Sequence, residues 1–125
     1  MVPFKVERGT GLEVIEAARS AVEIASDRQA SDVLLLDIRH LANFSDFFVI
    51  CSADSPRQVG AIANAMEDAL RLDGVKLRHR EGANDSGWVL LDFVDLIVHI
   101  FSPDQREHYD LEAAWSTAPQ LVRVP

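Results

Sequence analysis

Apolar residues recur every three or four positions in two long stretches of the chain, a spacing typical of helices with one buried face. The first stretch predicts a helix from about Leu12 to Asp27, and the second predicts a helix from Pro56 to about Asp73. Gly74 follows directly and is expected to end the second helix. The residues expected on the buried faces are Ile15, Ala18, Val22 and Ala25 in the first helix and Val59, Ile62, Ala63, Met66 and Leu70 in the second.

Three short motifs predict where helices begin. Thr10, Ser55 and Ser102 are each followed three residues later by Glu or Gln. In such a capping box the hydroxyl accepts from a first-turn amide, while the Glu or Gln side chain reaches back. Proline follows the second and third caps directly, at a position where its missing N–H costs little. The third motif therefore predicts a helix over residues 103–115, with a break near Tyr109.

Four other stretches have the composition of strands. Residues Val33 to Ile38 are nearly all aliphatic, and Phe47 to Cys51 are similar, which predicts two strands buried on both faces. Residues Val75 to Arg80 alternate between apolar and polar side chains, as in an edge strand or a half-exposed strand. The stretch from Gly87 to Phe101 supplies two more strands.

The elements follow in the order α-β-β-α-β-β-β-α, which predicts an α/β fold with a mixed sheet of about five strands flanked by helices. A chain of 125 residues has the usual length of one domain. We assign residues 12–115 to this domain, residues 1–11 to an N-terminal extension and residues 116–125 to a loose C-terminal tail.

The chain is acidic, with a formal net charge of −8 and a sequence pI of about 4.8. This charge repels nucleic acid at long range and argues against a direct reader of RNA or DNA. It permits docking on a basic protein, which an acidic surface attracts. No apolar run approaches the roughly 20 residues that a membrane helix needs, so we expect a cytoplasmic protein without a membrane contact.

The stretch GWVLLDFVDLIVHIF, from Gly87 to Phe101, is predicted to form a hairpin. With Phe93 and Val94 at the tip, a loop of two or four residues pairs Asp92 with Asp95, and paired residues share a face. The same register pairs Leu90 with Ile97 and Trp88 with His99. One face then carries Val89, Leu91, Leu96, Val98 and Ile100, and the other carries Trp88, Leu90, Asp92, Asp95, Ile97, His99 and Phe101. A loop of odd length would break this assignment.

The first of these faces is purely aliphatic and is expected in the core, whereas the second mixes tryptophan, aliphatic and acidic side chains. That mixture is typical of a protein-binding hot spot. Alternatively, the last helix covers this face and Trp88 is an ordinary core residue; the sequence leaves both interpretations open. Val94 is unusual at a tip, since tight turns favour Gly or Asn where φ is positive. The turn either avoids positive φ or is strained.

Asp92 and Asp95 raise the possibility of an enzyme, because paired carboxylates are common ligands of Mg²⁺. The two acids flank a turn, however, where acids are frequent, and no Gly-rich phosphate loop accompanies them. We therefore favour a structural role for them over a metal site.

Two other candidate sites have simpler structural explanations. His99 and the single cysteine, Cys51, would form a nucleophile pair, but Cys51 lies in a predicted buried strand with nothing nearby to activate it. Ser52, Ser55 and Arg57 lie at a predicted helix N-terminus, a natural anion site, yet helix capping alone explains the serines. We therefore expect no catalytic residue, metal or cofactor.

Several short blocks together resemble the ribosomal silencing factor family, also known as the Iojap-like family. They follow the family's order from about Leu12 to Trp115, and each block alone has low specificity. The blocks are Asp37-Ile38-Arg39, Asp46-Phe47-Phe48-Val49-Ile50, Ser55-Pro56-Arg57-Gln58-Val59, Glu81-Gly82, Gly87-Trp88-Val89-Leu90-Leu91-Asp92, the run from Asp95 to Phe101, Arg106-Glu107, Tyr109, Leu111-Glu112 and Trp115. The chain departs from the family at Val94 and Ala53, where glycine is usual or frequent.

The resemblance implies a homodimer related in fold to nucleotidyltransferases but without their catalytic motif. It implies binding to the fourteenth ribosomal protein of the large subunit, at the face that meets the small subunit. Occupying that face would block subunit joining and lower translation when nutrients are scarce; a role in large-subunit maturation is also implied. Carried over by the same resemblance, the partner-binding residues are Trp88, Leu90, Asp92, Asp95, Ile97 and His99.

Overall fold

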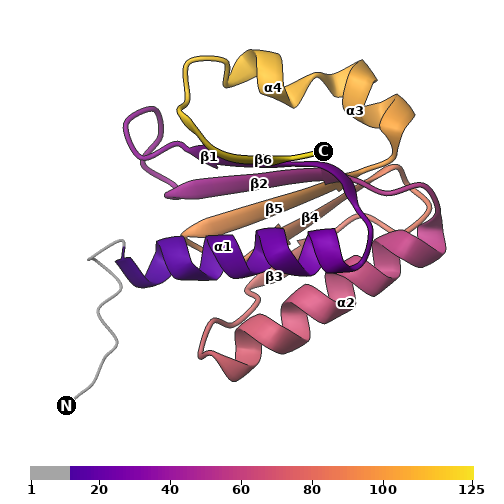
Figure 1. Ribbon diagram of the computed structural model, residues 1–125, viewed down its shortest axis with the longest axis horizontal. Helices are drawn as coiled ribbons and strands as arrows, with labels where there is room; N and C mark the ends of the chain where they lie inside the picture. Colours follow the sequence, from indigo (N-terminus) through magenta and orange to yellow (C-terminus); the bar gives the residue numbers. More distant parts are fainter. Residues whose placement is uncertain (1–11) are drawn as a thin grey trace.

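The computed structural model describes residues 12–125, which form a six-stranded sheet with helices on both faces (Figure 1). The helices are α1 (Leu12–Asp27), α2 (Pro56–Leu72), α3 (Pro103–Tyr109) and α4 (Leu111–Ala114). The strands are β1 (Ser31–Asp37), β2 (Phe47–Ser52), β3 (His79–Glu81), β4 (Trp88–Asp92), β5 (Leu96–Phe101) and β6 (Gln120–Val124). They lie in the order β3-β4-β5-β2-β1-β6, with β2 and β5 parallel and the other neighbours antiparallel. The predicted mixed α/β sheet is confirmed, with six strands rather than about five.

Helices α1 and α2 cover one face of the sheet because each carries the apolar stripe that its sequence predicts (Figure 1). All five predicted stripe residues of α2 are buried, as are Ala18, Val22 and Ala25 of α1. Ile15 is only partly buried and packs at the margin of the same core. Gly74 adopts a φ of 85° directly after α2, which explains why the helix ends there.

The predicted helix starts at Ser55 and Ser102 are confirmed. Each hydroxyl accepts a hydrogen bond from the backbone N–H of the glutamine three residues later, at 3.1 and 3.3 Å. The side chain of Gln58 also donates to the carbonyl oxygens of residues 28 and 29, so it joins the end of α1 to the start of α2. The predicted cap at Thr10 and the extension over residues 1–11 lie outside the described residues.

The predicted strand from Val75 to Arg80 is confirmed only at its end, because β3 spans His79–Glu81. It is an edge strand, as its alternating polar residues predict. The predicted break near Tyr109 is confirmed as well: Asp110 separates α3 from α4 in the left-handed conformation, with a φ of 48°.

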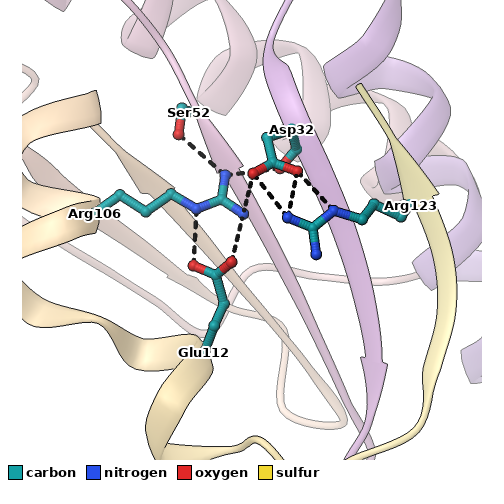
Figure 2. Close-up of polar contacts among 5 residues, drawn as sticks. All are labelled: Asp32, Ser52, Arg106, Glu112 and Arg123. Carbon is teal, nitrogen blue, oxygen red and sulfur yellow. Dashed lines mark hydrogen bonds and ion pairs between the residues drawn. The ribbon is translucent and has the colours of Figure 1, made fainter.

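The C-terminal residues form a strand, so the prediction of a loose tail is wrong. Strand β6 pairs antiparallel with β1, which would otherwise be an edge of the sheet with unpaired backbone groups. Val122 and Val124 pack against the core beneath α1 and α2. Arg123 forms two hydrogen bonds of 3.0 Å with the carboxylate of Asp32 in β1 (Figure 2). The domain therefore extends to about residue 124.

Arg106 holds α3 and α4 on the opposite face of the sheet (Figure 2). Its guanidinium is buried and forms paired hydrogen bonds with the carboxylate of Glu112 in α4, at 2.9 and 3.1 Å. It also donates to the carbonyl oxygen of Asp32 in β1 at 2.7 Å and to the hydroxyl of Ser52 in β2 at 3.0 Å. Because Asp32 also binds Arg123, one buried cation connects α3 and α4 to three strands.

We expect Arg106→Met to lower the free energy of unfolding by about 3 kcal/mol, because it leaves Glu112 and buried acceptors without their cation. Urea unfolding measures the change. Arg71→Met is the matched control, since Arg71 pairs with Asp68 on an exposed helix surface and its loss should change stability by less than about 0.5 kcal/mol. Equal changes in both variants would contradict the importance of the buried network.

Candidate functional site

Except for Asp95, which lies in the turn, the hairpin of β4 and β5 has the two faces that the sequence predicts, but the predicted register is wrong by two residues. Asp92 pairs with Ile97, and the tip consists of Val94 and Asp95. The register differs because Phe93 remains hydrogen-bonded in the strand ladder and its ring is buried in the core, so Phe93 does not lie at the tip. The remaining pairs are Trp88 with Phe101, Val89 with Ile100, Leu90 with His99 and Leu91 with Val98. A shift of two residues preserves both faces, because side chains alternate along a strand.

The aliphatic face of the hairpin is core, as predicted, and its five residues are at most 1% exposed. Cys51 lies in the same core, where burial raises the pKa of its thiol to about 12. Cys51 pairs with Ile100 across β2 and β5, whereas His99 pairs with Ile50 and points to the other face. Cys51 and His99 therefore do not form a nucleophile pair.

Trp88 lies on the second face, where its ring contacts neighbouring aromatic side chains and its side chain is partly buried. Its indole stacks on the ring of Phe101, with centroids 4.9 Å apart, and contacts the ring of Tyr109 in α3 at 4.7 Å. The indole N–H donates a hydrogen bond to Nδ1 of His99 at 3.2 Å. Helix α3 thus packs against Trp88 without burying it, since the side chain remains partly exposed.

Trp88, Leu90 and Ile97 are partly exposed neighbours on the same side of the hairpin, and we name them the hairpin face. Beside them is a hollow of about 210 Å³ lined by Trp88, Leu90, Glu81 and Gly82. Our sequence interpretation gave Glu81 no part in this surface. Its pairing with Leu90 across β3 and β4 brings it there, and the alternation of the edge strand is the signal that would have identified it.

Asp92 stabilises the turn. One carboxylate oxygen accepts the backbone N–H of Val94 at 2.7 Å, and the other forms an ion pair with Arg78. Val94 adopts a φ of 79°, and the N–H of Asp95 donates to the carbonyl oxygen of Phe93 at 3.1 Å. These features define a γ-turn with a β-branched central residue, which is a strained conformation.

Asp95 belongs to different surroundings from Asp92. It lines a cavity of about 530 Å³ together with Phe93 and residues of α1 such as Val14. Burial and the charge of Asp95 raise the pKa of Asp46 nearby. Within residues 12–125, no group of three His, Cys, Asp or Glu side chains is arranged to hold a metal ion. The geometry therefore favours the structural interpretation of the two acids over a Mg²⁺ site.

The two serines of the candidate anion site have intramolecular partners. Ser52 is buried and accepts a hydrogen bond from Arg106, and Ser55 caps α2. Capping therefore explains Ser55, whereas Ser52 binds Arg106 and does not cap the helix. Among the described helices, none has the length and apolar character needed to cross a membrane.

His99 is buried beside Trp88, with only 4% of its surface exposed, although the resemblance places it among the partner-binding residues. Its ring lies edge-on to Phe48, with centroids 4.7 Å apart. Nε2 is buried and has no hydrogen-bond partner among the described residues. Burial lowers the pKa of His99 to about 4, because charging the ring would leave a cation in an apolar core.

Comparison with known proteins identifies a family. The family model described as "Ribosomal silencing factor during starvation" matches residues 12–124. The ribosomal silencing factor of Bacillus subtilis is 37% identical over 79% of this chain and 84% of its own length. The chloroplastic protein Iojap of Zea mays is 36% identical over 93% of this chain and 50% of its own. The matched range includes β6, in agreement with the domain boundary in the structure.

Solved structures agree with this result. The crystal structure of a Chromobacterium violaceum protein has a TM-score of 0.80 and 34% identity, covering 84% of this chain and 88% of that one. A crystal structure from Bacillus halodurans has a TM-score of 0.71 and 34% identity, covering 88% and 97%.

Stability should depend on pH through His99. The pKa of His99 is about 4 in the folded protein and about 6.5 in the unfolded chain, so the unfolded chain binds the proton more readily between these values. We expect the free energy of unfolding to fall by about 3 kcal/mol as the pH drops from 6.5 to 4. Urea unfolding across this range measures the fall. His99→Phe should flatten it, whereas His108→Gln, at an exposed position, should not; a steep slope retained by His99→Phe would contradict the assignment.

Proposed function

Because the chain belongs to the ribosomal silencing factor family, we propose that it represses translation by binding the large ribosomal subunit and sterically blocking its joining with the small subunit. The proposed contact is the fourteenth ribosomal protein of the large subunit, and the proposed setting is the cytoplasm under nutrient limitation. The protein forms a homodimer, and it needs neither turnover nor a cofactor for this role. Participation in large-subunit maturation is part of the same proposal.

The observation that carries this proposal is the partial exposure of Trp88 on the hairpin face. A large aromatic ring beside Leu90 and Ile97 offers the kind of anchor that dominates protein interfaces. The neighbouring aromatic contacts hold the ring in place, so little freedom is lost on binding. The chain's net charge of −8 supports attraction to a basic ribosomal protein.

We give the acidic residues near the proposed interface different roles from those that the resemblance implies. Asp92 is paired with Arg78 and supports the turn, so its charge is partly neutralised and its main effect on binding is through the shape of the hairpin. Asp95 lines the cavity beside α1. Glu81 is exposed and lines the hollow beside Trp88, so it is the acid that we place at the rim of the interface.

We expect Trp88→Ala to weaken binding to purified large subunits by more than about thirtyfold, because it removes the apolar anchor. Sedimentation with large subunits, with small subunits alone as the negative control, measures the affinity. Leu72→Ala is the matched control, since Leu72 is 85% exposed at the end of α2, in the layer of helices on the other face of the sheet. Circular dichroism checks that each variant is folded.

Wild-type affinity in Trp88→Ala would contradict the hairpin face as the docking site while leaving the function intact. Failure of the wild-type protein itself to bind large subunits would contradict the proposed function.

Charge steering predicts a second result. Glu81→Lys should slow association with large subunits several-fold at low salt, and the difference should shrink as salt is added. Stopped-flow or surface-based kinetics at two ionic strengths measures the rate. Glu23→Lys makes the same change of charge on an exposed position of α1, beyond the opposite face of the sheet, and should have a smaller effect. Equal slowing by both variants would show that only the total charge matters.

A further inference from the structure

The hydrogen bond between Trp88 and His99 joins the proposed anchor to the middle of the sheet. His99 lies in β5, between β4 and β2, and pairs directly with Leu90 and Ile50. Trp88 is its diagonal neighbour on β4, a separation that aromatic side chains can bridge. The indole N–H donates to Nδ1 of His99 at 3.2 Å. This bond fixes both the protonation state of the histidine and the direction of the indole.

The bond requires a neutral imidazole with its proton on Nε2, because Nδ1 must present a lone pair to the indole. Nε2 is buried without a partner among the described residues, so this tautomer leaves one N–H unsatisfied in an apolar cluster. Leaving a buried donor unpaired is unfavourable, and a phenylalanine would fill the same space without that penalty. Packing alone therefore does not account for a histidine here, whereas the acceptor that it offers to Trp88 does.

We propose that His99 is a positioning residue, which holds the indole of Trp88 in the orientation that docks and does not itself touch the partner. This inference rests on the proposed function and refines it, since the resemblance places His99 among the residues that contact the partner. Both the burial of His99 and the direction of the hydrogen bond support the refinement.

The same bond defines the chemistry that the partner must offer. The indole has a single polar atom, and that atom donates to His99 within this protein. The exposed part of Trp88 therefore presents only carbon to the outside, together with Leu90 and Ile97. The complementary group on the partner is an apolar side chain or a lysine or arginine lying over the ring, and not a hydrogen-bond acceptor seeking the indole N–H.

The hydrogen bond can be tested first in the free wild-type protein labelled with ¹⁵N. We expect the His99 nitrogen shifts to report a neutral ring protonated at Nε2, and a scalar coupling to connect Nε1 of Trp88 with Nδ1 of His99. Trp115→Phe distinguishes the resonances of the two tryptophans. A proton on Nδ1 of His99 would overturn the inference, whether or not the protein binds ribosomes.

The binding test compares two substitutions of His99. His99→Phe keeps an aromatic ring but removes the acceptor, and we expect about tenfold weaker binding to large subunits. His99→Asn places an oxygen near the position of Nδ1 and should recover most of the lost affinity, provided that thermal unfolding shows both variants to be folded. If the indole N–H resonance of His99→Asn returns to its wild-type position but the affinity stays as low as that of His99→Phe, the role of the acceptor is overturned.

A Trp88→Phe background separates positioning from direct contact, because phenylalanine has no N–H to orient. If His99 acts through Trp88, adding His99→Phe in this background should change the affinity by less than about twofold. A further tenfold loss in the same background would mean that His99 contacts the partner itself and would overturn the inference. Absence of binding by the wild-type protein would instead contradict the proposed function, while the tautomer measurement would still test the hydrogen bond.

Discussion

The buried guanidinium of Arg106 determines how the second face of the sheet is covered. Helices α3 and α4 have seven and four residues and bury little apolar surface of their own, so packing alone gives them little stability. The contacts of Arg106 with Glu112, Asp32 and Ser52 connect these helices to β1 and β2 (Figure 2). Asp32 extends the same network to Arg123, and thereby to the C-terminal strand.

This arrangement makes the two faces of the sheet chemically different. Two long amphipathic helices bury one face, whereas the short α3–α4 segment covers the other only in part (Figure 1). The cluster on the second face ends at side chains that are still partly exposed, among them Trp88 and Ile97. The proposed docking surface is thus the partly exposed edge of a hydrophobic core. Its anchor, Trp88, is already held in place by contacts with Phe101, Tyr109 and His99.

The strained turn of the hairpin is a consequence of the burial of Phe93. Phe93 gains burial by staying in the ladder, and this leaves Val94 and Asp95 to reverse the chain. Asp92 supports the γ-turn by accepting the N–H of Val94, so the acid that suggests a metal ligand in the sequence acts on the backbone. The hydrogen bond that Val94 N–H donates to Asp92 offsets part of the strain that the side chain of Val94 brings at positive φ.

The sequence by itself determined the features that depend on neighbouring residues. The helices α1 and α2, the caps at Ser55 and Ser102 and the core face of the hairpin follow from periodicity and local chemistry, because both act within a few residues. Only the tertiary structure decided the pairing of β6 with β1, the partners of Arg106 and the burial of His99. These contacts join residues up to 91 positions apart, as Asp32 and Arg123 do, and no local pattern encodes such a pairing. The hairpin depends on both. The alternation of side chains in the sequence determined which residues share a face, whereas the burial of Phe93 in the tertiary structure determined which residues form the turn.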